Sequence, residues 1–204
     1  MLSEEVRENH EEMVNLAYTT YSMLKSVLPS RSVWFAGGFP RDLLLGREIK
    51  DIDVYLDVRN IPVRKLSYAG QHLQSIGFTV LGDEEYRGEE DEGLVHTVLE
   101  SEDKKVNIIL LNYRAPQYVR EKFDLGLCQV MIGEDEGTIY MTDSFVHDVY
   151  HQVISVHTEV GEHLARVMNK YPTFSTQRPS STPGSWVLRS QVAECIIKCG
   201  EYHE

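Results

Sequence analysis

Apolar residues recur along the chain with two different periods, and these periods predict its secondary structure. From residue 3 to about residue 28 they return every three or four positions, as on an amphipathic helix that Pro29 ends. After Pro29, short runs that are apolar or that alternate between apolar and polar residues predict strands. Gly46 and Gly77 mark the ends of predicted helices. The predicted elements are a helix over 3–28, a strand over 33–36, a short helix over 38–46, a strand over 51–57, a helix over 62–76 and a strand over 78–81.

The second half of the chain predicts hairpins followed by helices. Residues 82–93 are acidic and marked by glycines, as in a loop, and residues 172–185 have the Pro, Ser and Thr content of a linker. The predicted elements are hairpins of 94–99 with 105–111 and of 125–132 with 138–141, a helix near 159–171 and a helix over 186–199. This order predicts an α+β fold with a mixed β-sheet of about five to seven strands and flanking helices.

The length and the order of elements predict one main core with two smaller parts. A chain of 204 residues is long enough to bury one sizeable core. We expect residues 1–29 to form an N-terminal helix that packs on the core and residues 30–157 to form the main domain. Residues 158–204 are expected to form a helical extension that contains the Pro/Ser/Thr-rich loop.

Composition and charge exclude several classes of protein. With 42% hydrophobic and 25% charged residues, the chain has the composition of a globular protein, and no apolar run has the roughly 20 residues that span a membrane. The net charge of −12 argues against broad, sequence-independent binding of nucleic acid. Three cysteines and an N-terminus without the pattern of a secretion signal predict a cytoplasmic protein.

Two glycines and two aspartates have the arrangement that phosphate and magnesium chemistry requires. Asp51 and Asp53 are two residues apart in a predicted strand, so both side chains lie on one face and can share a pair of metal ions. Gly37 and Gly38 allow backbone amides to approach an anion, and the helix after them adds its positive end. Each feature alone is commonplace, but together at this spacing they are specific.

The segment AGGFPRDLLLGREIKDIDVYL, residues 36–56, resembles the head domain of CCA-adding enzymes and bacterial poly(A) polymerases. These enzymes are polymerase-β-like nucleotidyltransferases. The resemblance implies that the chain uses a nucleoside triphosphate with Mg²⁺, or with Mn²⁺ as an alternative, and that Asp51 and Asp53 are catalytic metal ligands. It implies nucleotide-binding roles for Gly37, Gly38, Arg41 and Asp42.

A looser similarity extends over roughly residues 30–150. The stretch KFDLGLCQVMI is similar to the family's Arg-Asp-Phe-Thr-Ile-Asn segment, with Asp124 at the position of its aspartate and Cys128 at that of its asparagine. Arg166 resembles an arginine that contacts the nucleotide after the head domain, although a solvated helix face is the alternative. Little room remains for the tRNA-binding domains of CCA-adding enzymes, so the chain also resembles compact stand-alone members, including proteins encoded by phages.

The chain departs from the family at one position that matters for catalysis. The family's third carboxylate, on the hairpin strand, is matched here by Asn107. An asparagine can ligate a metal through its carbonyl oxygen, but it cannot accept a proton as a general base does. Glu100 or Asp124 supplies the missing carboxylate only if the fold brings one of them to the metals.

Two functions follow, and the sequence leaves both open. The first is an enzyme that transfers a nucleoside monophosphate to an acceptor, RNA or protein, and releases pyrophosphate. The second is an inactive nucleotidyltransferase-fold protein that acts by binding a nucleotide or a protein, for example as a phage anti-defence factor. His147 and His151 have the helical spacing of a zinc pair but no evident third ligand, which favours structural roles.

Overall fold

The computed structural model describes residues 2–29, 31–81, 93–133, 138–158, 161–178 and 186–188. The chain has two compact units, Met1–Gln117 and Tyr118–Glu204. The boundary between them falls within helix α5 (Ala115–Lys122). Both units contain helices and strands, so the prediction of an α+β fold is confirmed.

Five strands of the first unit form a mixed sheet in the order β1-β2-β5-β4-β3. Strand β2 runs parallel to β5, and every other pair in this order is antiparallel. Apolar side chains of β2 and β5 are fully or almost fully buried, and they form the core of this unit. The strands are β1 (Val33–Ala36), β2 (Ile52–Asp57), β3 (Phe78–Val80), β4 (Val95–Ser101) and β5 (Val106–Leu111).

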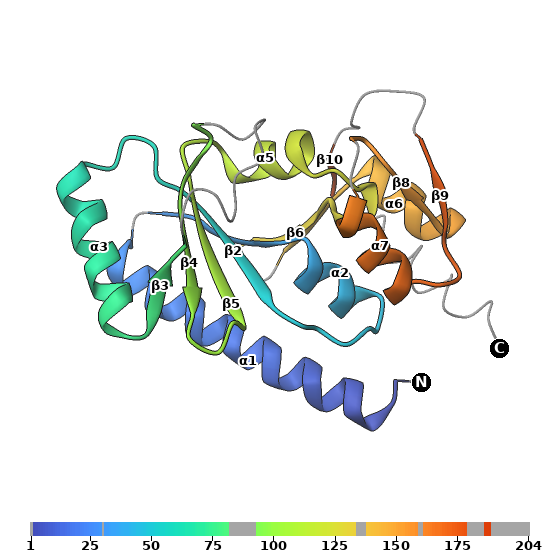
Figure 1. The fold of residues 1–204 in the computed structure, drawn as a ribbon, viewed down its shortest axis with the longest axis horizontal. Helices are drawn as coiled ribbons and strands as arrows, with labels where there is room; N and C mark the ends of the chain where they lie inside the picture. Colours follow the sequence, from blue (N-terminus) through green and yellow to red (C-terminus); the bar gives the residue numbers. More distant parts are fainter. Residues whose placement is uncertain are drawn as a thin grey trace. The chain divides into compact units, whose positions relative to one another are not determined.

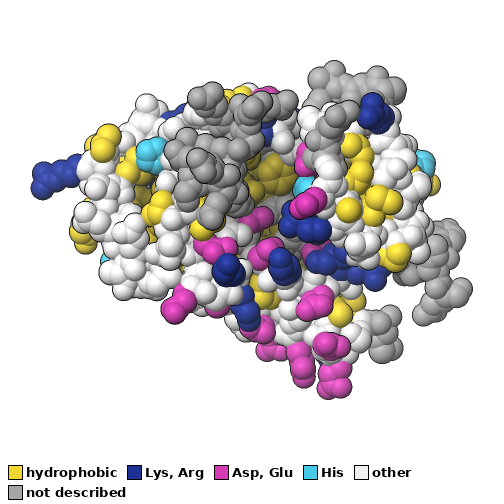
Figure 2. Space-filling model, viewed as in Figure 1, with side chains coloured by type: hydrophobic (Ala, Val, Ile, Leu, Met, Phe, Trp, Pro, Cys, Tyr) yellow, Lys and Arg dark blue, Asp and Glu magenta, His cyan; other side chains and the backbone are white. Residues whose placement is uncertain are grey.

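Helices α1 (Glu4–Val27), α2 (Gly38–Leu44) and α3 (Val63–Ser75) complete the first unit. Figure 1 shows the long helix α1 running beside the sheet and α3 beside the edge strand β3. Helix α1 begins at Ser3, whose side chain caps it, and one face of the helix is buried. The opposite face is acidic (Figure 2), with exposed side chains of Glu4, Glu5, Glu8, Glu11 and Glu12.

The described part of the second unit contains two sets of paired strands, the helices α6 and α7, and the end of α5. An antiparallel sheet has the order β10-β7-β6, and a separate pair, β8 with β9, is parallel. Helix α6 contacts the turn η2 and strand β8. The elements are η2 (Gly126–Cys128), β6 (Val130–Ile132), β7 (Ile139–Thr142), α6 (Asp143–His151), β8 (Val153–Ser155), α7 (Gly161–Lys170), β9 (Ser175–Gln177) and β10 (Trp186–Leu188).

The predicted hairpin of 125–132 with 138–141 is confirmed for β6 and β7, which pair antiparallel. Its first strand begins only at Val130, because the residues before it form the 3₁₀ turn η2, whose three residues are all buried and so lack a strand's alternation. The helix predicted over 186–199 is wrong for residues 186–188, which pair with β7 as a strand, and its remainder lies outside the described residues. Residues 82–92 of the predicted acidic loop also lie outside them.

Tertiary contacts create elements where the sequence pattern predicted none. Helices α5 and α6 and strands β8 and β9 are short, so each has too few apolar repeats to be distinguished from a loop. Within the described part of the chain, no helix is both long and apolar enough to cross a membrane.

Candidate active site

Strand pairing places the glycine turn beside the aspartates. The last residue of β1, Ala36, is the cross-strand partner of Asp53 in β2, so the chain leaves the sheet next to Asp53. Gly37 then has φ 74° and ψ −122°, a conformation that residues with a Cβ rarely adopt, and Gly38 begins α2. A Cβ on Gly38 would lie 4.0 Å from Oδ1 of Asp51. The turn and both carboxylates therefore lie together.

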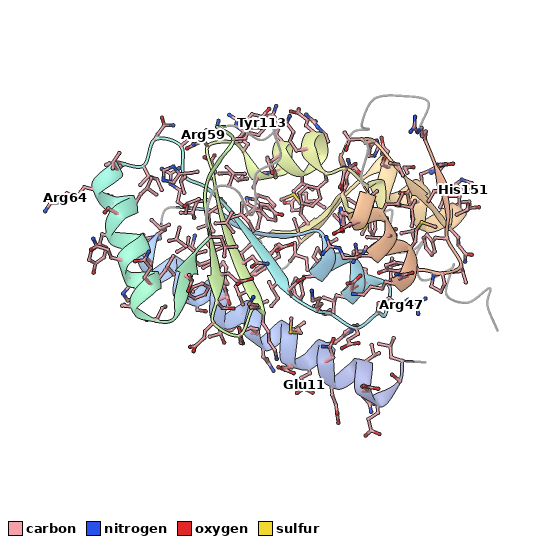
Figure 3. All side chains as sticks on the ribbon, viewed as in Figure 1. Glu11, Arg47, Arg59, Arg64, Tyr113 and His151 are labelled. Carbon is pink, nitrogen blue, oxygen red and sulfur yellow. The ribbon has the colours of Figure 1, made fainter. Side chains whose placement is uncertain are left out.

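The loop between α2 and β2, which ends at Asp51, is held by α1. The side chain of Asn9 makes two hydrogen bonds to the backbone of Ile49. Its Nδ2 donates to the carbonyl oxygen at 3.0 Å, and its Oδ1 accepts from the amide at 2.7 Å. Nε2 of the neighbouring His10 donates to the carbonyl of Arg47 at 2.8 Å, and Figure 3 labels Arg47 in this loop. These hydrogen bonds hold the backbone up to Ile49, two residues before Asp51, and so they restrict where the carboxylate of Asp51 can lie.

Arg41 and Asp42 form a buried ion pair at the start of α2. Nε of Arg41 donates to Oδ1 of Asp42 at 2.6 Å, and Nη2 donates to Oδ2 at 3.1 Å. Both side chains are less than a tenth exposed. Nη2 of Arg41 also lies 3.7 Å from the position that a Cβ of Gly38 would occupy. Asp42 therefore orients the guanidinium beside the glycine turn.

Asn107, the residue matched by sequence to a third carboxylate, lies beside Asp53. The two residues are paired in the parallel ladder of β2 and β5, and Nδ2 of Asn107 donates to Oδ1 of Asp53 at 2.9 Å. Glu100 is paired with Asn107 from the other side, so it is two strands, roughly 10 Å, from Asp53. Oε2 of Glu100 also lies 3.9 Å from Nζ of Lys104. The register thus puts an amide, and not Glu100, next to Asp53.

The carboxylates present fit one magnesium ion better than two. Magnesium is usually held by one or two carboxylates together with substrate phosphates and water, and Asp51 and Asp53 can supply the carboxylates beside the glycine turn. A second ion normally shares a further carboxylate. Among the described residues, no group of three His, Cys, Asp or Glu side chains could hold a metal ion.

Asp124 lies in the second unit, where it pairs with a histidine. Its Oδ2 is 2.8 Å from Nδ1 of His163 on α7, and this hydrogen bond, together with one to Cys128, raises the pKa of His163 to about 9. His163 is therefore protonated at neutral pH and forms an ion pair with Asp124. Cys128 itself is buried. Asp124 thus fixes α7 to the segment before η2.

Arg166, one turn after His163 on α7, has an exposed side chain. The exposure agrees with the solvated helix face that the sequence left open, and nothing in the second unit tests its predicted contact with a nucleotide. Of the predicted site residues, Gly37, Gly38, Arg41, Asp42, Asp51 and Asp53 belong to the first unit, and Asp124 and Arg166 belong to the second.

Sequence reasoning did not identify Asn9, His10 and His163. The first two lie on an amphipathic helix among many polar residues, and their backbone partners are about forty residues away, so no local pattern reveals them. His163 had a weak signal, because it is three residues before Arg166 on the same predicted helix.

Comparison with solved structures shows the fold. The chain is similar to a CCA-adding enzyme in an apo form, with a TM-score of 0.50 and 19% identity over 75% of this chain and 35% of that one. It is similar to Thermotoga maritima CCA-adding enzyme complexed with tRNA, with a TM-score of 0.50 and 21% identity over 71% of this chain and 32% of that one. The chain thus spans about a third of the length of these enzymes.

Sequence comparison shows the family. No curated protein matches the chain. The model of the Gabija anti-defense 2 family matches residues 7–152, a span that includes most of α1, the glycine turn, both aspartates and Asn107. Because this match covers well over half of the chain, the protein belongs to the Gabija anti-defense 2 family.

Proposed function

We propose that the protein binds a nucleoside triphosphate with magnesium at Gly37, Gly38, Asp51 and Asp53 and transfers its nucleoside monophosphate to an acceptor. The observation that supports this most is the convergence of the glycine turn with the aspartates. It arises from the pairing of Ala36 with Asp53 and from the closeness of Asp51 to Gly38. The nucleotidyltransferase fold of the structural neighbours agrees with it.

Each residue of this site has a role in the proposed reaction. Asp51 and Asp53 would hold magnesium, which would neutralise charge on the phosphates when bound. The amides of the glycine turn and Arg41 orient the triphosphate. The acceptor hydroxyl attacks the α-phosphorus, the bond to the β-phosphate oxygen breaks, and pyrophosphate leaves. The hydroxyl proton passes to water, because Asn107 cannot accept it.

The acceptor in this proposal is an RNA or a protein in the cytoplasm of the host cell. The family's description names Gabija anti-defence, so we propose that the transfer counteracts a Gabija system.

Transfer of label tests the proposal. The protein is incubated with α-³²P-labelled ATP, CTP, GTP or UTP, magnesium or manganese, and extract from cells with or without Gabija. Label should enter RNA or protein with the wild type and with Glu102→Gln, whose acidic side chain is exposed elsewhere. It should be absent with Asp51→Asn/Asp53→Asn. No transfer with any nucleotide would refute the enzyme.

The hydrogen bond from Asn107 to Asp53 favours a second candidate, which is nucleotide binding without turnover. Such a protein would act by sequestering a nucleotide or by presenting a nucleotide-bound surface to a defence protein. Phage plating on cells with a Gabija system separates the candidates when combined with the labelling assay. Three results together would support binding alone. The wild type protects the phage from the Gabija system, no label is transferred, and Asp51→Asn/Asp53→Asn no longer protects the phage.

A further inference from the structure

Two exposed imidazoles lie side by side on α6. His147 and His151 are four residues apart and therefore share a face of the helix, and their ring centroids are 4.6 Å apart with a tilt of 44°. Both side chains are exposed. Exposure argues against the core role that histidines often have, and no described contact of His151 lies outside α6.

The hydrogen-bond and ion-pair contacts of His147 within the described part of the chain are at Nδ1. Nδ1 of His147 lies 3.2 Å from Nε2 of Gln177 and 3.5 Å from Oδ1 of Asp148. Gln177 and Asp148 are themselves fixed, because both bond to Ser155. Nε2, on the opposite edge of the ring, therefore faces away from this network.

A partner for a metal-bound His147 lies beside its ring. A histidine that binds a metal through one ring nitrogen usually donates its other N–H to a carboxylate or a backbone carbonyl. In this structure Nδ1 of His147 accepts from the amide of Gln177, so a metal on Nε2 requires the ring proton to move to Nδ1. The fully buried Asp148, whose Oδ1 lies 3.5 Å from Nδ1, can then accept that proton. The ring of Tyr150 meets His151 edge-on at 4.9 Å and limits where that imidazole can turn. Figure 3 labels His151 at the end of α6.

We propose that His147 and His151 chelate one divalent transition-metal ion, Zn²⁺, Ni²⁺ or Cu²⁺, through their Nε2 atoms. Imidazole nitrogen suits these ions, whereas magnesium prefers oxygen ligands. Since no third His, Cys, Asp or Glu of the described residues completes a metal-binding group, water fills the remaining positions and the ion exchanges readily. The site lies in the second unit and is independent of the proposed function.

Titration calorimetry tests the proposal. Untagged full-length protein carrying Asp51→Asn/Asp53→Asn, which removes the other candidate metal ligands, is titrated with NiCl₂, ZnCl₂ or CuCl₂ in a non-chelating buffer. We expect one ion per chain. His151→Gln and His147→Gln should each weaken binding by roughly tenfold or more, because the chelate is lost. His72→Gln, which removes an exposed histidine of α3, should leave the affinity unchanged.

His151→Gln is the decisive variant, because His147 also contacts Gln177 and its replacement could disturb the fold. Circular dichroism checks that each variant is folded. Unchanged affinity in His151→Gln, or no binding to the starting protein, would overturn the proposal. Electron paramagnetic resonance of the Cu²⁺-loaded protein adds a direct readout, in which coupling to two imidazole nitrogens is expected and coupling to fewer would also overturn it.

Discussion

At the scale of single residues, the second unit depends on the absence of a side chain at Gly126. A Cβ there would lie 2.7 Å from Oδ2 of Asp148 and 3.1 Å from the Cβ atoms of Ser144 and Ser155. The first distance is shorter than real contacts allow, and Asp148 cannot move because Ser155 holds both of its oxygens. The turn η2 can therefore pack this closely against Asp148 and Ser155 only with a glycine at position 126.

We therefore predict that Gly126→Ala lowers the free energy of unfolding by about 1–3 kcal/mol through overpacking. Gly70→Ala is the matched control, because a Cβ at this position within α3 meets nothing within 4 Å. It should raise the free energy of unfolding by about 0.5–1 kcal/mol, as alanine does in a helix. Urea denaturation measures both, and a Gly126→Ala protein as stable as the wild type would contradict the packing.

Asn107 is the residue that decides between the two proposed functions. Asn107→Asp removes the donor to Asp53 and places two carboxylates side by side, which repel each other unless a cation lies between them. We predict that Mg²⁺ with ATP raises the Tm of this variant more than that of the wild type. Asn112→Asp, an exposed change near the end of β5, is the control. Equal increases in Tm in the wild type, Asn107→Asp and Asn112→Asp would show that Asn107 is not at the metal site.

At the scale of elements, α1 both packs on the core and positions the loop before Asp51. Asn9→Ala removes the two side-chain hydrogen bonds to the amide and carbonyl of the buried Ile49. We therefore predict that the free energy of unfolding falls by about 1–3 kcal/mol. Binding of Mg²⁺ with ATP should also weaken. Asn15→Ala, exposed on the same helix, controls for the change in helix propensity. Destabilisation without weaker nucleotide binding would limit Asn9 to a structural role.

The pairing of His163 with Asp124 makes the docking of α7 depend on pH. The pKa of His163 is raised from 6.5 to about 9 by Asp124 and Cys128, so the folded protein keeps a proton that the unfolded chain releases. The stabilisation is fully present below pH 6.5 and is lost as pH rises through about 9. We predict that the difference in Tm between wild type and His163→Gln shrinks from pH 6 to pH 9.5. A constant difference would contradict the ion pair.

At the scale of the whole molecule, the charge of −12 predicts how the protein meets nucleic acids. Non-specific binding gains its free energy from cations released at phosphates, and clustered Lys and Arg are needed for it. We predict negligible binding to random single-stranded RNA or duplex DNA at 0.15 M salt, measured by fluorescence anisotropy. A steep loss of binding as the salt concentration rises would instead reveal a basic patch and favour an RNA acceptor.

The sequence predicted most of the first unit. The long helix, the strand before the glycine turn and the strand with the aspartates have strong periodic patterns, and the structure places them within a residue or two of the predicted bounds. The second unit was predicted less well, because its elements are short and their contacts are not local. The β10 segment Trp186–Leu188 is a strand because it pairs with β7, and no neighbouring residue signals that pairing.

By itself, the sequence determined the α+β class and the type of chemistry that Gly37, Gly38, Asp51 and Asp53 suit, because turn conformation and strand alternation are local properties of the chain. Only the tertiary structure decided what lies beside them. The ladder of β2 and β5 puts Asn107, and not a carboxylate, against Asp53, and α1 reaches back to hold the loop before Asp51. Such contacts join residues forty or more positions apart, and their register depends on how the whole core packs.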